Sequence, residues 1–168
     1  MAETITPKYV ARLGAELLVT PVNPLVSNTV IGIDELPWVG YVGPGATEPS
    51  PHVFTKTLMD PASGHFCMVV RIEPGAAGPS HWHTSDTIYI VRRGELHIPG
   101  EGVYREGDFR WVQGGYAYGG ELPGPEGVEF FFISLGPYGW FDPDVEEPPR
   151  GRWDRPADPS PPPAAPPS

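Results

Sequence analysis

The stretch GAAGPSHWHTSDTIYIVRRGE, residues 75–95, decides how the fold is interpreted. It places His81 and His83 one residue apart and runs directly into a segment of β-branched and aromatic residues. Side chains at positions i and i+2 of a strand point to the same face, so both imidazoles are expected to enter one space. Two imidazoles alone hold a catalytic metal poorly, so a metal site here needs a further donor.

Short strand signals surround the two histidines. The segment FTKTLMDPASGHFCMVVRIEP, residues 54–74, predicts two strands joined by the turn DPASG, in which Pro61 fixes the first turn dihedral and Gly64 takes a positive φ. The segments TIYIVRRGELHIPGEG, VYREGDFRWVQGG and GVEFFFISLGP are rich in β-branched and aromatic residues and are bounded by Gly, Pro or Asp. At least six short strands with no convincing helix between them predict an all-β fold, an antiparallel β-sandwich or small barrel.

The composition predicts one domain with extensions at both ends. A chain of 168 residues suffices for one core, and its 39% hydrophobic residues argue for a packed interior despite 24 Pro and 21 Gly. We expect an N-terminal arm over residues 1–30, formed by a short helix or by a strand that pairs with a second subunit, and the β domain over residues 31–142. Residues 143–168, acidic and then proline-rich, are expected to form a solvated tail, with a proline-recognition ligand as the alternative.

Charge and targeting signals exclude several classes of function. A formal net charge of -10 repels a phosphate backbone, so nucleic acid is not an expected partner. No run approaches the ~20 apolar residues of a membrane helix, and the first residues lack the pattern of a signal peptide. The lone Cys67 excludes an internal disulfide and suits a reducing compartment. We therefore expect a cytoplasmic protein that does not bind membranes.

Two sets of residues in the chain have motif-like spacing. The first set is Gly75, His81, His83, Thr87 and Gly94. The second set is Gly107, Asp108, Gly115 and Tyr118. These spacings resemble the frames of the two sequence motifs of the cupin superfamily. Cupins have a glutamate at the Thr87 position and their last histidine at the Tyr118 position. The chain therefore resembles a small single-domain cupin, or monocupin, and its layout is similar to that of dihydroxyacetophenone-dioxygenase-like and anti-sigma-factor-type cupins.

The resemblance implies a cupin barrel, a double-stranded β-helix, with a metal held by His81 and His83. Without metal, the two histidines would be buried hydrogen-bonding residues. Tyr118 is a candidate third ligand, because a phenolate is a hard anionic donor, and the alternative is that it packs or hydrogen-bonds in the pocket. Asp86 would reach the metal only through a β-bulge that rotates it inward. If Thr87 faces the metal, water or substrate takes that coordination position.

Aromatic residues are the candidates for the rest of the site. Tyr116 and Tyr118 share a strand face by the i, i+2 rule, so either phenol is a candidate catalytic acid or base. Tyr89, Trp111 and Phe132 are candidates for the walls of a substrate pocket, and plain core packing is the alternative for each.

These residues favour a metal-dependent enzyme that acts on a small oxygenated substrate, aromatic or diketone-like, and foremost a non-haem Fe(II) dioxygenase. The expected cofactor is one divalent transition metal, Fe(II) first, with Zn, Mn or Ni as alternatives. A non-redox isomerase, cyclase or lyase is the alternative enzyme, and a non-catalytic cupin that senses a small molecule or a metal is the alternative outside enzymes. The expected assembly is a homodimer, because sheet edges and the arm can pair with a second copy.

Overall fold

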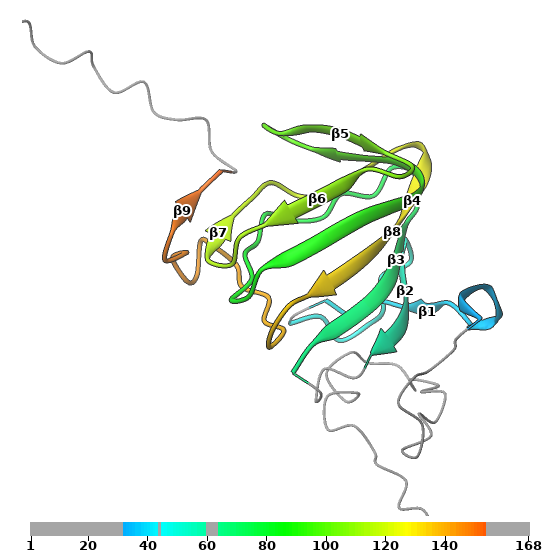
Figure 1. Ribbon diagram of the computed structural model, residues 1–168, viewed down its shortest axis with the longest axis horizontal. Helices are drawn as coiled ribbons and strands as arrows, with labels where there is room; N and C mark the ends of the chain where they lie inside the picture. Colours follow the sequence, from blue (N-terminus) through cyan, green and yellow to red (C-terminus); the bar gives the residue numbers. More distant parts are fainter. Residues whose placement is uncertain (1–31, 44, 60–63, 154–168) are drawn as a thin grey trace, which may run out of the picture.

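The computed structural model describes residues 32–43, 45–59 and 64–153 of the chain (Figure 1). A short 3-10 helix, η2 (Ile33–Glu35), precedes the β-strands of this part. The strands are β1 (Val39–Gly40), β2 (Val53–Met59), β3 (Phe66–Ile72), β4 (Thr87–Ile98), β5 (Gly102–Arg105), β6 (Phe109–Val112), β7 (Tyr116–Ala117), β8 (Leu122–Ser134) and β9 (Gly151–Arg152). The predicted all-β fold is confirmed. In the described residues no helix has the length and apolarity needed to cross a membrane.

Seven strands form one antiparallel sheet in the order β1-β2-β3-β8-β4-β5, with β6 paired to β4 (Figure 1). The predicted hairpin is confirmed as β2 and β3, which pair from Val53 with Ile72 to Met59 with Cys67. Its turn, residues 60–63, lies outside the described residues. β8 comes late in the sequence yet lies between β3 and β4, so Phe132 pairs with Met68 on one side and Tyr89 on the other.

One face of this sheet carries the hydrophobic core. On β3 the alternate residues Phe66, Met68, Val70 and Ile72 are buried in the core cluster, as the period of two in a strand requires. The neighbouring strands add aromatic rings to the same face: Tyr89 from β4, and Phe130 and Phe132 from β8. The inner face is therefore both apolar and aromatic.

The motif residue Gly94 lies where β4 and β8 pass close together. Its φ is +74°, and a Cβ at this position would overlap the backbone carbonyl of Gly127 on β8. The β4–β8 register shifts directly after it, between Gly94 and Leu96. A side chain here would strain the backbone and push the two strands apart, which explains a glycine at this motif position.

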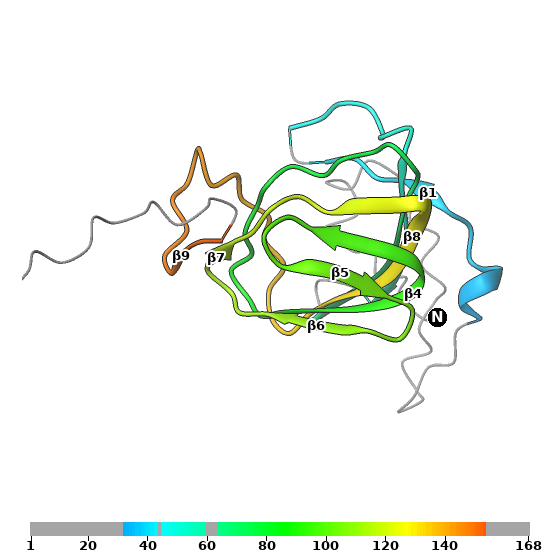
Figure 2. The ribbon, with the colours of Figure 1, turned by 90° about the horizontal axis from the view of Figure 1, so that it is seen from above.

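Short bridged segments, instead of long strands, carry the two motif histidines. His81 forms an isolated bridge with Tyr118, and Trp82 forms one with Phe141. β7 and β9 add a parallel pair, which lies on the far side of the molecule from β1 and η2 (Figure 2). Backbone hydrogen bonds from Gly115 to His83 and between Tyr118 and His81 tie the end of the second motif to the histidine segment.

The packed domain continues past the predicted boundary at residue 142. The Trp82 indole nitrogen donates to the Glu146 carbonyl at 2.9 Å, and the Trp153 backbone N–H donates to the Ala117 carbonyl at 2.7 Å. Residues 143–153 therefore belong to the fold and not to a tail. The predicted arm over residues 1–30 and the proline-rich end from residue 154 lie outside the described residues.

Candidate functional site

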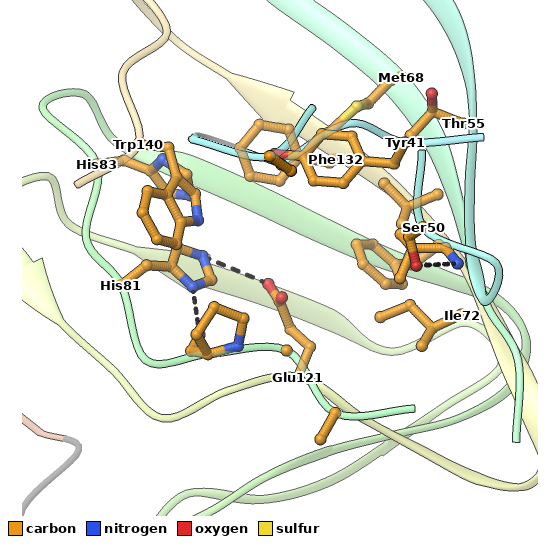
Figure 3. A pocket seen from close by; sticks show the side chains of 18 of the residues that line it. Tyr41, Ser50, Thr55, Met68, Ile72, His81, His83, Glu121, Phe132 and Trp140 are labelled. Atoms are coloured by element: carbon orange, nitrogen blue, oxygen red, sulfur yellow. Dashed lines mark hydrogen bonds and ion pairs between the residues drawn. The ribbon is translucent and has the colours of Figure 1, made fainter. Parts of the chain in front are cut away.

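A pocket of about 350 Å³ lies on the inner face of the sheet (Figure 3). Apolar side chains of β3 and β8, among them Met68 and Phe132, form a wall of it. His81 and His83 lie at one end, and Ser50 lies at the other (Figure 3). A mainly apolar pocket of this size with polar groups at its ends suits a small organic molecule.

Backbone carbonyls fix the orientation of both imidazoles. Nδ1 of His81 lies 2.9 Å from the Pro79 carbonyl oxygen, and Nδ1 of His83 lies 2.6 Å from the Gly139 carbonyl oxygen. A carbonyl oxygen only accepts hydrogen bonds, so each Nδ1 carries a proton and donates it. The Nε2 atoms are left for other partners, as they are in histidines that bind a metal through Nε2.

His83 is buried with one polar atom that lacks a partner. Its side chain is 4% exposed, and its Nε2 has no hydrogen-bond partner in the described part of the chain. Burial, together with the neighbouring His81, lowers the pKa of His83 from 6.5 to about 3. The imidazole is therefore neutral at physiological pH, and its Nε2 lone pair is free to bind a cation. An unmet acceptor of this kind costs about 1–3 kcal/mol unless a ligand or solvent satisfies it.

A chain of hydrogen bonds runs from the pocket to His81. The Tyr89 hydroxyl donates to Glu121 Oε1 at 2.9 Å and lies 2.5 Å from the Tyr118 hydroxyl. The Tyr118 hydroxyl lies 2.9 Å from His81 Nε2, and Glu121 Oε1 lies 3.7 Å from the same nitrogen. Figure 3 shows the Glu121 carboxylate pointing toward His81. Burial raises the pKa of both phenols, so both are neutral hydroxyl groups.

This chain of hydrogen bonds needs one proton more than the two phenols supply. The chain contains three hydrogen bonds, but the two phenols bring only two protons. When Glu121 accepts from Tyr89 and Tyr89 accepts from Tyr118, the third proton comes from His81 Nε2. A metal ion at that nitrogen would take the place of this proton.

Arg110 packs against the two phenols from β6. Its guanidinium carbon lies 4.5 Å from the centre of the Tyr118 ring and 4.9 Å from the centre of the Tyr89 ring. Its Nε and Nη2 donate to Glu101 at 2.7 and 2.6 Å, which balances its charge. The phenols are thus held between a buried ion pair on one side and the histidines on the other.

A close contact between two glycine-containing segments places Glu121 in the pocket. The Gly78 N–H donates to the Glu121 carbonyl at 3.0 Å, and a Cβ on Gly120 would overlap the Gly78 carbonyl. Only a residue without a side chain fits at position 120 of this crossing. It sets the backbone of Glu121 directly beside the segment that leads to His81.

The structure brings together four of the predicted site residues and separates two others. His81, His83, Tyr89 and Phe132 line the pocket. Tyr118 lies behind His81, 1% exposed, and contacts it without being part of the pocket lining.

Tyr116 and Trp111 lie away from the pocket. Tyr116 is expected to share a strand face with Tyr118, but its ring stacks on Trp153, with ring centres 4.4 Å apart. Trp111 is 53% exposed because alternation on β6 turns it outward while Arg110 points inward, so its predicted place in the pocket wall is wrong.

Neither residue near the missing glutamate position lines the pocket. Asp86 accepts from the Gly114 N–H at 2.9 Å and from the Trp111 indole at 3.2 Å, so no bulge turns it inward. Thr87 is 1% exposed and pairs with Val112 and Ser134, and it does not line the pocket.

Glu121 is the residue that the sequence interpretation missed. It lies three positions after Tyr118, outside the positions where the motif has its ligands. A signal was present: the ten residues before it and the four after it carry no charge, so Glu121 is a lone carboxylate in an aromatic and glycine-rich stretch. A charge isolated in this way needs a specific partner if it is not exposed.

The types of donor atom fit a divalent metal, although the side chains are not close enough together to surround an ion as they stand. Two Nε2 atoms with fixed orientation, one of them unpartnered, and a nearby carboxylate are ligands that a first-row metal accepts. Among the described residues no three His, Cys, Asp or Glu side chains are grouped closely enough to hold an ion as they stand. Metal binding therefore requires a small shift of at least one side chain.

The antiparallel barrel with paired histidines at one end of an inner pocket is the arrangement of a cupin. Residues 26–139 match the family model described as the ChrR Cupin-like domain, and the chain belongs to this family. The cupin resemblance seen in the motif spacing is confirmed. No curated protein matches the sequence.

Solved structures of cupins are similar to this fold. A protein from Methylibium petroleiphilum PM1, provisionally named an acetylacetone dioxygenase, matches with a TM-score of 0.55 and 18% identity over 74% of this chain and 88% of that one. An acetylacetone dioxygenase from Acinetobacter johnsonii matches with a TM-score of 0.56 and 16% identity over 71% and 81%. An RmlC-like cupin from Ralstonia eutropha JMP134 matches with a TM-score of 0.55 and 19% identity over 70% and 73%. At these identities the likeness establishes the fold alone.

The buried neutral His83 predicts a pH dependence of stability in metal-free protein. The unfolded chain binds a proton at this residue below about pH 6.5, and the folded chain binds it only near pH 3. The contribution of His83 is therefore complete above pH 6.5 and is lost as the pH falls toward 3, at up to about 1.4 kcal/mol per pH unit. Urea unfolding between pH 7 and 4.5 should show a shallower loss for His83→Gln than for the wild type. Equal slopes would contradict this account of His83.

Proposed function

We propose that the chain is a metal-dependent cupin enzyme that acts on a small oxygenated organic molecule, foremost as a non-haem Fe(II) dioxygenase. The observation that carries the proposal is the buried, unpartnered Nε2 of His83, whose ring is fixed by the Gly139 carbonyl next to the pocket. His81 and His83 would hold the ion, and Tyr118 stays a predicted third ligand. When bound, Fe(II) supplies Lewis acidity and the activation of dioxygen.

The orientation of His81 and His83 supports a metal in preference to a purely structural role. A structural histidine normally satisfies both ring nitrogens, because an unmet buried acceptor is costly. Here His83 Nε2 has no partner among the described residues, whereas His81 Nε2 contacts the Tyr118 hydroxyl. The ring centres lie 4.9 Å apart, and each Nδ1 donates to a carbonyl, so both rings turn Nε2 away from the backbone. Carbonyls that orient the imidazoles in this way act as the outer partners of metal-binding histidines do.

The pocket walls support a small substrate with oxygen atoms at one end. The apolar residues Val70, Ile72 and Phe130 would exclude water and pack against a carbon skeleton. Glu121 and the Tyr89 hydroxyl lie at the histidine end, where they can accept from or donate to oxygen groups of the substrate. A compact diketone or enol fits this division into an apolar and a polar end.

We base the proposed class of substrate on the names of two similar cupins. Both the Methylibium petroleiphilum protein and the Acinetobacter johnsonii protein are named acetylacetone dioxygenases, and we carry that activity over to this chain as a proposal. The Glu121 carboxylate in the pocket favours a second candidate, a non-redox isomerase, cyclase or lyase. In that reaction Glu121 would accept a proton from a carbon next to a carbonyl group, and a metal held by the histidines would supply Lewis acidity.

The metal content of the purified protein tests the first part of the proposal. Protein prepared without chelator should hold about one equivalent of a divalent transition metal, and His83→Ala should lose it. His97→Ala is the matched control, because His97 pairs with Glu95 at 3.0 Å on β4, outside the pocket lining, and its loss should leave the metal in place. Wild-type protein with less than about a tenth of an equivalent, and no uptake of added Fe, Mn, Ni or Zn, would overturn the metalloenzyme proposal.

Dioxygen consumption tests the second part. Protein loaded with Fe(II) and given acetylacetone should consume dioxygen, and His81→Ala should abolish this. Tyr116→Phe should keep the activity, because Tyr116 stacks on Trp153 away from the pocket. Hydrogen exchange at the substrate carbon in Zn-loaded protein without dioxygen use would favour the non-redox candidate. Metal binding with neither reaction would favour the sensing cupin.

We also propose that the protein forms a homodimer. β6 pairs with β4 alone among the described strands, and its outward residues Phe109 and Trp111 are 60% and 53% exposed. Two adjacent exposed aromatics on an edge strand favour burial against a second copy. Light scattering at micromolar concentration should give twice the mass of one chain, and the mass of a single chain would contradict the dimer.

A further inference from the structure

We propose that Glu121 supplies the carboxylate ligand of the metal, from a position outside both cupin motifs. The inference rests on the proposed function, in that it requires a metal at His81 and His83. It answers where the third protein donor comes from, since the motif position of the glutamate is occupied by Thr87.

The distance between Glu121 and His81 supports a shared ion. Two ligands at about 2.1 Å from one metal ion lie roughly 3.0 to 3.4 Å from each other in octahedral or tetrahedral geometry. Glu121 Oε1 lies 3.7 Å from His81 Nε2, a few tenths of an ångström longer. The carboxylate therefore needs only a small movement toward His81 to share a ligand sphere with it.

The surroundings of Glu121 resemble those of a supported metal ligand. Its backbone is fixed by the Gly78 N–H, and its Oε1 accepts the Tyr89 hydroxyl. Carboxylates that bind metals are themselves hydrogen-bonded by outer groups, which orient them. Tyr89 is fully buried, and Arg110 packs on its ring, so this support is rigid.

The other candidate donors are placed less well. Tyr118 lies within 2.9 Å of His81 Nε2 but is not part of the pocket lining, and its hydroxyl is already engaged with Tyr89. Asp86 is held by Trp111 and Gly114. The pocket lining contains one other carboxylate, the exposed Glu48.

Two histidines and one carboxylate leave several coordination positions open. This ligand set is the one that non-haem Fe(II) oxygenases use, with room for a chelating substrate and dioxygen. With Glu121 as the third ligand, the chain would keep that set although the motif glutamate and the last motif histidine are both replaced. Glu121 lines the same pocket in which the substrate is proposed to bind, so the open positions would face it.

Metal affinity tests the assignment without relying on activity. Metal-free protein is titrated calorimetrically with Zn²⁺, and separately with Fe(II) in the absence of oxygen. Glu121→Gln should weaken binding by more than about 100-fold, because loss of an outer partner alone costs 10–100-fold. Glu48→Gln is the matched control, with the same loss of charge in the same pocket, and should bind as the wild type does. Unchanged circular dichroism and melting temperature verify the fold of both variants.

Tyr118→Phe separates the two possible third ligands. If Glu121 is the ligand, this variant still binds the metal and loses no more than the roughly 10–100-fold of an outer partner, and the Fe(III) form of the wild type lacks the visible charge-transfer band of a bound phenolate. Loss of metal in Tyr118→Phe with retention in Glu121→Gln would overturn the inference and assign the ligand to Tyr118. Equal affinity of Glu121→Gln and wild type would also overturn it, whereas a wild type that binds no metal would refute the proposed function itself.

Discussion

The hydrogen bonds from Nδ1 of His81 to the Pro79 carbonyl and from Nδ1 of His83 to the Gly139 carbonyl are the constraint on which the site depends. They fix both rings in the orientation that turns Nε2 away from the backbone. Pro79 is close to His81 in sequence, but Gly139 lies 56 positions after His83, so the orientation of His83 exists only in the folded chain. This arrangement leaves the Nε2 acceptor of His83 without a partner, which lowers the free energy of unfolding. A metal ion bound at that nitrogen would remove this loss.

A second layer of interactions connects this constraint to the sheet. The insertion of β8 between β3 and β4 places Phe132 beside Tyr89, and Tyr89 in turn contacts Tyr118 and Glu121. Arg110, inward on β6, closes the layer from the other side. Because the phenols, the Glu121 carboxylate and His81 contact one another from different segments, they are positioned as one unit.

Period-two patterning and turn residues were enough to predict the all-β fold and the β2–β3 hairpin, and the resemblance of the motif spacings predicted the cupin family, because these features are local in sequence. The motif spacing also identified His81 and His83. Trp111 could not be placed, since its direction depends on which face of β6 meets the core. Glu121 lies outside the motif frame, and the contact of Gly78 with Gly120, 42 positions later, brings it to His81. Contacts of this range follow from the sheet order, which the sequence pattern does not specify.

The most direct test of the central claim is the protonation of His83 in metal-free protein near neutral pH, measured by ¹⁵N–¹H correlation spectra of the imidazole rings. The account predicts a neutral ring with its proton on Nδ1 and a bare Nε2, and a shift of the Nε2 resonance alone when Zn²⁺ is added. A proton on Nε2, or spectra that do not change with Zn²⁺, would contradict it.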